Sequence, residues 1–186
     1  MLLAFEAGAA SGFEGDFAPD SGNWVITPDQ GSVVFNGLTN LTLAGPRGPL
    51  GVEVQSEEVI TYTSLLQGGT LGFHWSLNVE NGLSATAYFV WGADNNVEFL
   101  ASGPLGYTAG GDFFGTLQPG DPFSFVLDSD VIKGKGTTPQ FMITEFGFDP
   151  VPEPALCSFA ALCALTWWGY ARLRRRRAQP ASAAEP

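Results

Sequence analysis

Residues 70–77 read Thr70-Leu71-Gly72-Phe73-His74-Trp75-Ser76-Leu77, and they indicate the fold class more clearly than any other segment. The large apolar residues occupy every second position, and the small or polar residues occupy the positions between them. Successive side chains of a β-strand point to opposite faces, so this alternation predicts a strand with one buried and one exposed face. No helical period persists between residues 12 and 150, which excludes a helical domain there.

The same alternation recurs along the chain between turn signals such as Asn36-Gly37, Asp94-Asn95-Asn96 and Gly110-Gly111. The predicted strands are 24–27, 32–35, 41–44, 59–63, 70–77, 85–91, 97–101, 112–117, 123–128 and 140–148. Eight to ten short antiparallel strands at this spacing are typical of a sandwich. The sequence therefore predicts an all-β fold, an antiparallel two-sheet sandwich of jelly-roll type, over residues 12–150.

Charge divides the chain into two unlike parts. Residues 1–150 hold 17 Asp and Glu against Arg47, Lys133 and Lys135, a net charge of −14, whereas residues 151–186 carry +3. Five arginines packed at one end do not suit a nucleic-acid binder, which needs basic residues spread over a folded surface. Both cysteines, Cys157 and Cys163, lie in the tail, so the acidic part has neither a disulfide scaffold nor a cysteine zinc site.

The tail is predicted to cross a membrane. Residues 155–171 are 17 uncharged residues, enough for a helix at the short end of what spans a bilayer. Aromatic residues precede the arginines, as expected at the lipid–water boundary, and the cationic end should stay in the cytoplasm. The interface and positive-inside anchors are Trp167, Trp168, Tyr170, Arg172, Arg174, Arg175, Arg176 and Arg177.

A short proline-containing box, an apolar span and a basic cluster follow one another at the C-terminal end. This arrangement resembles the PEP-CTERM sorting signal of bacterial exosortase substrates. Here the box is Val151-Pro152-Glu153-Pro154, the span is 155–171 and the cluster is 172–177, followed by a polar tail at 178–186. The resemblance implies secretion by a Gram-negative bacterium that makes exopolysaccharide, and processing near the box by an exosortase-type enzyme. Proteins with this tail are at times filed under an ice-binding label, which says nothing about the attached domain.

The N-terminus is short for a secreted chain. Residues 1–11 contain no Lys or Arg, and only four apolar residues separate Met1 from Glu6, but Ala7-Gly8-Ala9-Ala10-Ser11 is like the small-residue end of a signal peptide. We interpret 1–11 as the remnant of a truncated signal peptide; an ordinary N-terminal segment is the alternative.

The acidic domain also resembles the jelly-roll modules of secreted bacterial proteins, including carbohydrate-binding ones. The residues that suggest this are Phe13-Glu14-Gly15-Asp16-Phe17, Asn23-Trp24, residues 68–75 and Phe146-Gly147-Phe148-Asp149. The resemblance supports the architecture more than it identifies a ligand.

Catalytic residues are not evident from the sequence. His74 is the only histidine, and Ser76 on the same predicted strand face would lie about 7 Å away, too far for a nucleophile–base contact. Glu57 and Glu58 are adjacent and would point to opposite faces of a strand, so they do not form the facing pair that a glycosidase needs. We therefore expect a protein that is not an enzyme.

No cofactor is expected, with a structural calcium ion as the minor alternative. Glu14, Asp16 and Asp149 lie near the first and last strands, and Asp94-Asn95-Asn96 is a second acidic loop. Carboxylate oxygens are the ligands that Ca²⁺ prefers, but solvated acidic loops explain the same residues.

Exposed aromatic side chains would mark a sugar-binding surface, because a flat ring packs on the apolar face of a pyranose. The candidates are Tyr62, Tyr88, Trp91 and Tyr107, although a sandwich core takes most aromatic residues.

The sequence thus predicts a non-catalytic, surface-sorted protein of a bacterial envelope or extracellular matrix. Its expected partners are the inner membrane, through residues 155–171, an exosortase-type enzyme and exopolysaccharide. A polysaccharide-binding module is the alternative function, and a glycoside-active enzyme is the third.

Overall fold

A computed structural model describes residues 10–47, 51, 53–63, 65–80, 82–132 and 138–151. Within these residues the fold is all-β, with a single turn of 3₁₀ helix, η1 (Gly15–Phe17). The strands are β1 (Ala10–Ser11), β2 (Trp24–Pro28), β3 (Ser32–Asn36), β4 (Asn40–Ala44), β5 (Glu53–Tyr62), β6 (Gly69–Val79), β7 (Gly82–Trp91), β8 (Asn96–Pro104), β9 (Tyr107–Leu117), β10 (Phe123–Ile132) and β11 (Gln140–Pro150).

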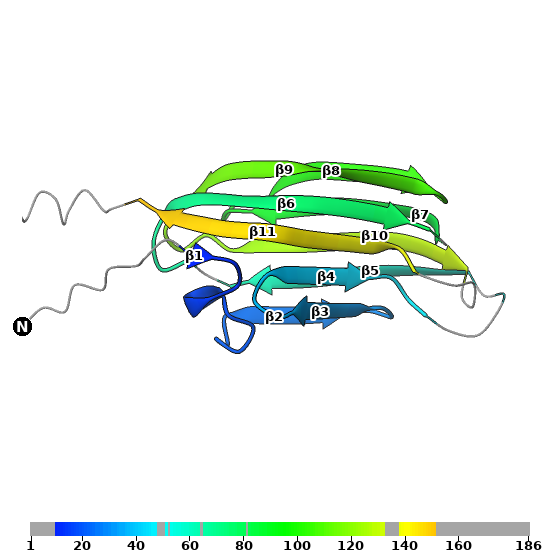
Figure 1. Cartoon of the computed structure of the whole chain (residues 1–186), viewed down its shortest axis with the longest axis horizontal. Coiled ribbons are helices and arrows are strands. Elements are labelled where there is room, and N and C mark those ends of the chain that lie inside the picture. Colours follow the sequence, from blue (N-terminus) through cyan, green and yellow to red (C-terminus); the bar gives the residue numbers. More distant parts are fainter. Residues whose placement is uncertain are drawn as a thin grey trace, which may run out of the picture. The chain divides into compact units, whose positions relative to one another are not determined.

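These strands form two antiparallel sheets packed face to face (Figure 1). Sheet A has the order β3-β4-β11-β6-β9, with β1 added beside β11, and sheet B has the order β2-β5-β10-β7-β8. From β4 onward every connection except β7–β8 crosses from one sheet to the other. This order is that of an eight-strand jelly roll, extended by the β2 and β3 strands at one side. The predicted two-sheet sandwich is confirmed.

Alternating positions of both sheets fill the core, as the sequence pattern predicts. In β6 the apolar residues from Leu71 to Leu77 are at most 8% exposed, and the residues between them are half-buried. The rings of Phe13 and Phe17 close one end of the sandwich, where Phe13 stacks on Phe146 at 4.7 Å between ring centroids. Stacked and edge-to-face aromatic pairs add to the burial of apolar area.

One predicted turn is wrong. Gly110-Gly111 lies inside β9, which begins at Tyr107. The two glycines pair with Ser76 and Trp75 of β6. A Cβ on Gly111 would lie 3.2 Å from the Trp75 ring, a tight contact, because the ring packs against the backbone of this glycine.

The predicted C-terminal helix falls on residues 155–171, outside the described residues. Among the residues that are described, no helix is long and apolar enough to cross a membrane. Ala10–Ser11, which belong to the stretch interpreted as a signal remnant, pair with Phe148 and Gly147 of β11.

Candidate functional site

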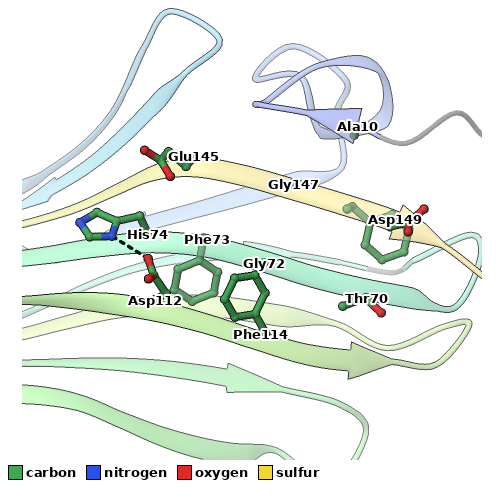
Figure 2. A pocket seen from close by; sticks show the side chains of 11 residues that line it. Ala10, Thr70, Gly72, Phe73, His74, Asp112, Phe114, Glu145, Gly147 and Asp149 are labelled. Carbon is green, nitrogen blue, oxygen red and sulfur yellow. Dashed lines mark hydrogen bonds and ion pairs between the residues drawn. The ribbon is translucent and has the colours of Figure 1, made fainter.

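The outer face of sheet A carries a groove whose floor is made of glycine. Gly72 of β6 pairs with Phe114 of β9 on one side and with Gly147 of β11 on the other, and Ser11 of β1 pairs with Gly147. Because neither glycine has a side chain, the surface is hollow between the Phe114 ring and β1. The groove has a volume of about 370 Å³ (Figure 2).

Phe114 forms one wall of this groove. Its side chain is 76% exposed, the highest value among the large apolar residues of the described chain. The ring lies against Gly72, since a Cβ placed there would be 2.9 Å from two ring atoms. It packs on no other aromatic ring of the described residues, unlike the rings of the core. A flat apolar surface of this kind, held beside a groove, is suited to stacking on a ligand.

A hydrogen-bonded His–Asp pair lies at one end of the groove. His74 pairs with Asp112 across β6 and β9, and its Nδ1 lies 2.7 Å from Oδ1 of the carboxylate (Figure 2). Both side chains reach solvent, at 42% and 61% exposure. The carboxylate orients the imidazole, so that its Nε2 is left to bind a ligand. Ser76, the serine considered as a nucleophile, lies two residues further along β6.

Polar groups also lie at the other end of the groove, where Thr70 of β6 pairs with Asp149 of β11. Between the two ends, the register of β11 shifts between Thr144 and Gly147. This β-bulge places Glu145 in the left-handed region, at φ 51°, and its side chain is exposed beside the groove. Bulges commonly redirect a side chain toward a binding site.

The two glutamates considered for glycosidase chemistry do point to opposite faces. Glu57 is exposed on sheet B, whereas Glu58 is fully buried between the sheets. The Glu58 carboxylate accepts hydrogen bonds from backbone N–H groups of Asp29 and Gly31, at 3.0 and 2.7 Å, and from the Ser56 hydroxyl. These contacts make Glu58 a structural residue.

The structure gives the calcium alternative no support in the part of the chain it describes. No three His, Cys, Asp or Glu side chains gather there in a way that could hold a metal ion. Asp16 and Asp149 are both exposed, and Asn95 adopts φ 52° in the turn between β7 and β8.

The predicted aromatic candidates are mostly part of the core. Tyr62 is 1% exposed, and its burial, reinforced by the negative charge of Asp16, raises the pKa of its hydroxyl. Trp91 stacks on Phe89 at 5.4 Å, and Tyr107 is half-buried. Tyr88 lies on the outer face of sheet B.

Sequence reasoning missed Phe114 and Phe99, the two most exposed phenylalanine rings among the described residues, the second 58% exposed beside Tyr88. A signal for Phe114 was present. Phe113 and Phe114 are consecutive in a strand, so one of the two rings must point away from the core.

Of the predicted sorting residues, the structure describes Val151 alone. It is 53% exposed, and its N–H donates to the carbonyl of Gly68 at 3.0 Å. The others lie outside the described residues: Pro152, Glu153, Pro154, Trp167, Trp168, Tyr170, Arg172, Arg174, Arg175, Arg176 and Arg177.

No protein-family model matches the chain, and no curated protein matches it. Among solved structures, it is similar to the secreted serine protease VesC from Vibrio cholerae, at 19% identity and a TM-score of 0.38, over 69% of this chain and 24% of VesC. The chain thus spans about a quarter of VesC. TmCBM61 in complex with β-1,4-galactotriose matches at 15% identity and a TM-score of 0.40, over 75% and 94% of the two chains. A family 29 carbohydrate-binding module matches at 10% identity and a TM-score of 0.35, over 68% and 78%. At these identities and TM-scores, none of the matches indicates a function for this chain.

Proposed function

We propose that the β-sandwich is a polysaccharide-binding module and that the groove on sheet A is its binding site. The observation that carries this proposal is the Phe114 ring, which is exposed and lies against Gly72 beside a groove with a glycine floor. Solvating such a ring is unfavourable, and stacking on the apolar face of a pyranose would remove that area from water.

The polar groups around the ring suit a ligand rich in hydroxyls. The His74–Asp112 pair offers a ring nitrogen and carboxylate oxygens, and Thr70 and Asp149 offer further oxygens at the opposite end. A few polar groups placed around an apolar surface are the usual composition of a small-ligand site. The arrangement binds sugar without a facing nucleophile, so we propose a non-catalytic role.

The C-terminal tail suggests where in the cell this polysaccharide binding would take place. We propose that the protein is secreted, held in the inner membrane through residues 155–171, and sorted to the envelope or matrix by an exosortase-type enzyme. This part rests on the order of the box at 151–154, the apolar span and the arginines at 172–177. Exopolysaccharide would then be the natural ligand of the groove.

The direct test is native gel electrophoresis of the full chain in mild detergent, through gels that contain hydroxyethylcellulose, galactan, glycol chitosan or alginate. We expect at least one of these polysaccharides to retard the protein. Phe114→Ala should weaken that retardation about tenfold, because an aromatic anchor at a binding site contributes roughly 1–2 kcal/mol.

Phe99→Ala is the matched control, since it removes a comparably exposed ring from the other sheet. It should leave the retardation unchanged. Equal loss in both variants, or no retardation of the wild-type protein by any of the four polysaccharides, would contradict a binding site at the groove.

A further inference from the structure

A second groove adjoins the first on the outer face of sheet A. It has a volume of about 570 Å³ and reaches Thr39 and Asn40 at the turn between β3 and β4. Three residues line both grooves: Ala10, Glu145 and Gly147. Together the grooves run across β9, β6, β11 and β4, a path of about 14 Å at the usual spacing of strands.

Glu145 lies where the two grooves meet. The bulge makes Thr144 and Glu145 both point outward, although they are consecutive residues of one strand. The Glu145 carboxylate makes no hydrogen bond or ion pair with any other described residue. Its charge is therefore available to a ligand that occupies either groove.

The charges around the grooves are complementary to a cationic chain. Carboxylates of Asp112, Glu145 and Asp149 line them, and His74 is the basic side chain among the described lining residues. Arg47 is the one Lys or Arg among the described residues, and it lines neither groove. A polymer with ammonium groups would be attracted to this surface, and a chain of uronates or sulfated sugars would be repelled.

We propose that the two grooves form one continuous site for a polysaccharide with free amino groups, and that Glu145 contacts that ligand. The inference rests on the proposed function and names its ligand class. Phe114 provides the apolar platform in the first groove, Glu145 binds an ammonium group at the junction, and Asn40 and Thr39 provide hydrogen-bonding groups at the far end.

The test is isothermal titration calorimetry of the full chain with β-1,4-linked glucosamine oligomers. The hexamer should bind about tenfold more tightly than the dimer, because only the longer chain fills both grooves. The N-acetylglucosamine hexamer is the matched ligand, since it has the same linkage and rings but no charge. It should bind about fivefold more weakly than the amine.

Two substitutions test Glu145 itself. Glu145→Gln should weaken binding of the glucosamine hexamer about fivefold, whereas the control Glu98→Gln, an exposed glutamate on sheet B, should not. Glu145→Gly should weaken binding further and also raise the thermal midpoint of unfolding, because glycine adopts φ 51° without strain. A gain in stability with a loss of binding excludes misfolding as the cause.

Each part of the proposal has its own contrary result. Equal affinity for dimer and hexamer would overturn the continuous site, and equal affinity for the acetylated hexamer would overturn the amino ligand. Unchanged binding in Glu145→Gln would overturn its contact with ligand, and no binding of any glucosamine oligomer would overturn the whole inference. None of these four results tests the proposed function itself. That test remains the comparison of the wild-type protein with Phe114→Ala in gels that contain neutral polysaccharides.

Discussion

At the scale of single residues, the buried carboxyl group of Glu58 fixes the turn that connects the two sheets. Its carboxylate binds the turn between β2 of sheet B and β3 of sheet A, through the N–H groups of Asp29 and Gly31. Gly31 has no room for a Cβ, which would overlap the carbonyl oxygen of Ala44 and the Glu58 carboxylate itself. The Glu58 carboxyl group is itself fully buried, and a buried polar group needs such hydrogen-bond partners because water cannot reach it.

Glu58→Ala should therefore lower the free energy of unfolding by about 2–4 kcal/mol, since it removes the partner of the partly buried turn N–H groups and of the buried Ser56 hydroxyl and opens a cavity. Urea denaturation of the two proteins measures this change. Glu57→Ala removes the same side chain from the solvent face and should change stability by less than about 0.5 kcal/mol. Similar losses in both variants would show that the Glu58 contacts are not what stabilises this end of the sandwich.

At the scale of elements, β11 organises the candidate site. It pairs with β4, β6 and β1, so it lies under both grooves. Its bulge turns Glu145 outward, and its Gly147 leaves the floor open. A regular strand with side chains at these positions would present a filled surface, so the irregularity of β11 is what makes the groove.

Gly147→Leu should close the groove and leave the fold intact. A Cβ at Gly147 meets only the carbonyl oxygen of Ala10, at 3.6 Å, which is ordinary contact, and the backbone there is not left-handed. We expect polysaccharide affinity to fall more than about tenfold while the urea midpoint changes little.

Thr27→Leu adds a similar side chain to an exposed position of sheet B and serves as the control. Retained affinity in Gly147→Leu, measured in the same gels, would show that the ligand does not occupy the groove.

At the scale of the whole molecule, charge and hydropathy separate an acidic part from a tail with an apolar span and a basic cluster. Residues 1–150 carry a net charge of −14. A charge of this size favours solubility and repels anionic surfaces. Residues 155–171 carry no charge, and arginines follow them. We expect water to surround the acidic part and lipid to surround the apolar span.

If the tail is a sorting signal, protein recovered from its native cells should lack everything beyond the box at 151–154. Mass spectrometry of both mature termini measures this directly. A C-terminal peptide that still contains Arg172 to Arg177, found only in the membrane fraction, would mean a permanent anchor and would contradict exosortase processing.

The strand pattern was predictable in most of the strands whose buried residues are large and apolar, such as β6. It was less so in β5, which begins at Glu53, six residues before the predicted strand. Ser56 and Glu58 take inward positions there, and their polarity hides the alternation. The backbone N–H groups that bond to these two side chains belong to Gln30 and Gly31, which are distant in the sequence. The local sequence pattern therefore does not predict that these polar residues are buried.

The two-sheet sandwich, its charge and its turn at Asn95 could be predicted from the sequence, because alternation, charge and turn preference are local properties of the chain. The candidate site could not, because it forms only when the strands pair. Phe114, Gly72 and Gly147 become one groove through the pairing of β9, β6 and β11, and these strands are up to 75 residues apart. A residue's exposure depends on which strand lies beside it, and that is settled by the packing of the whole domain.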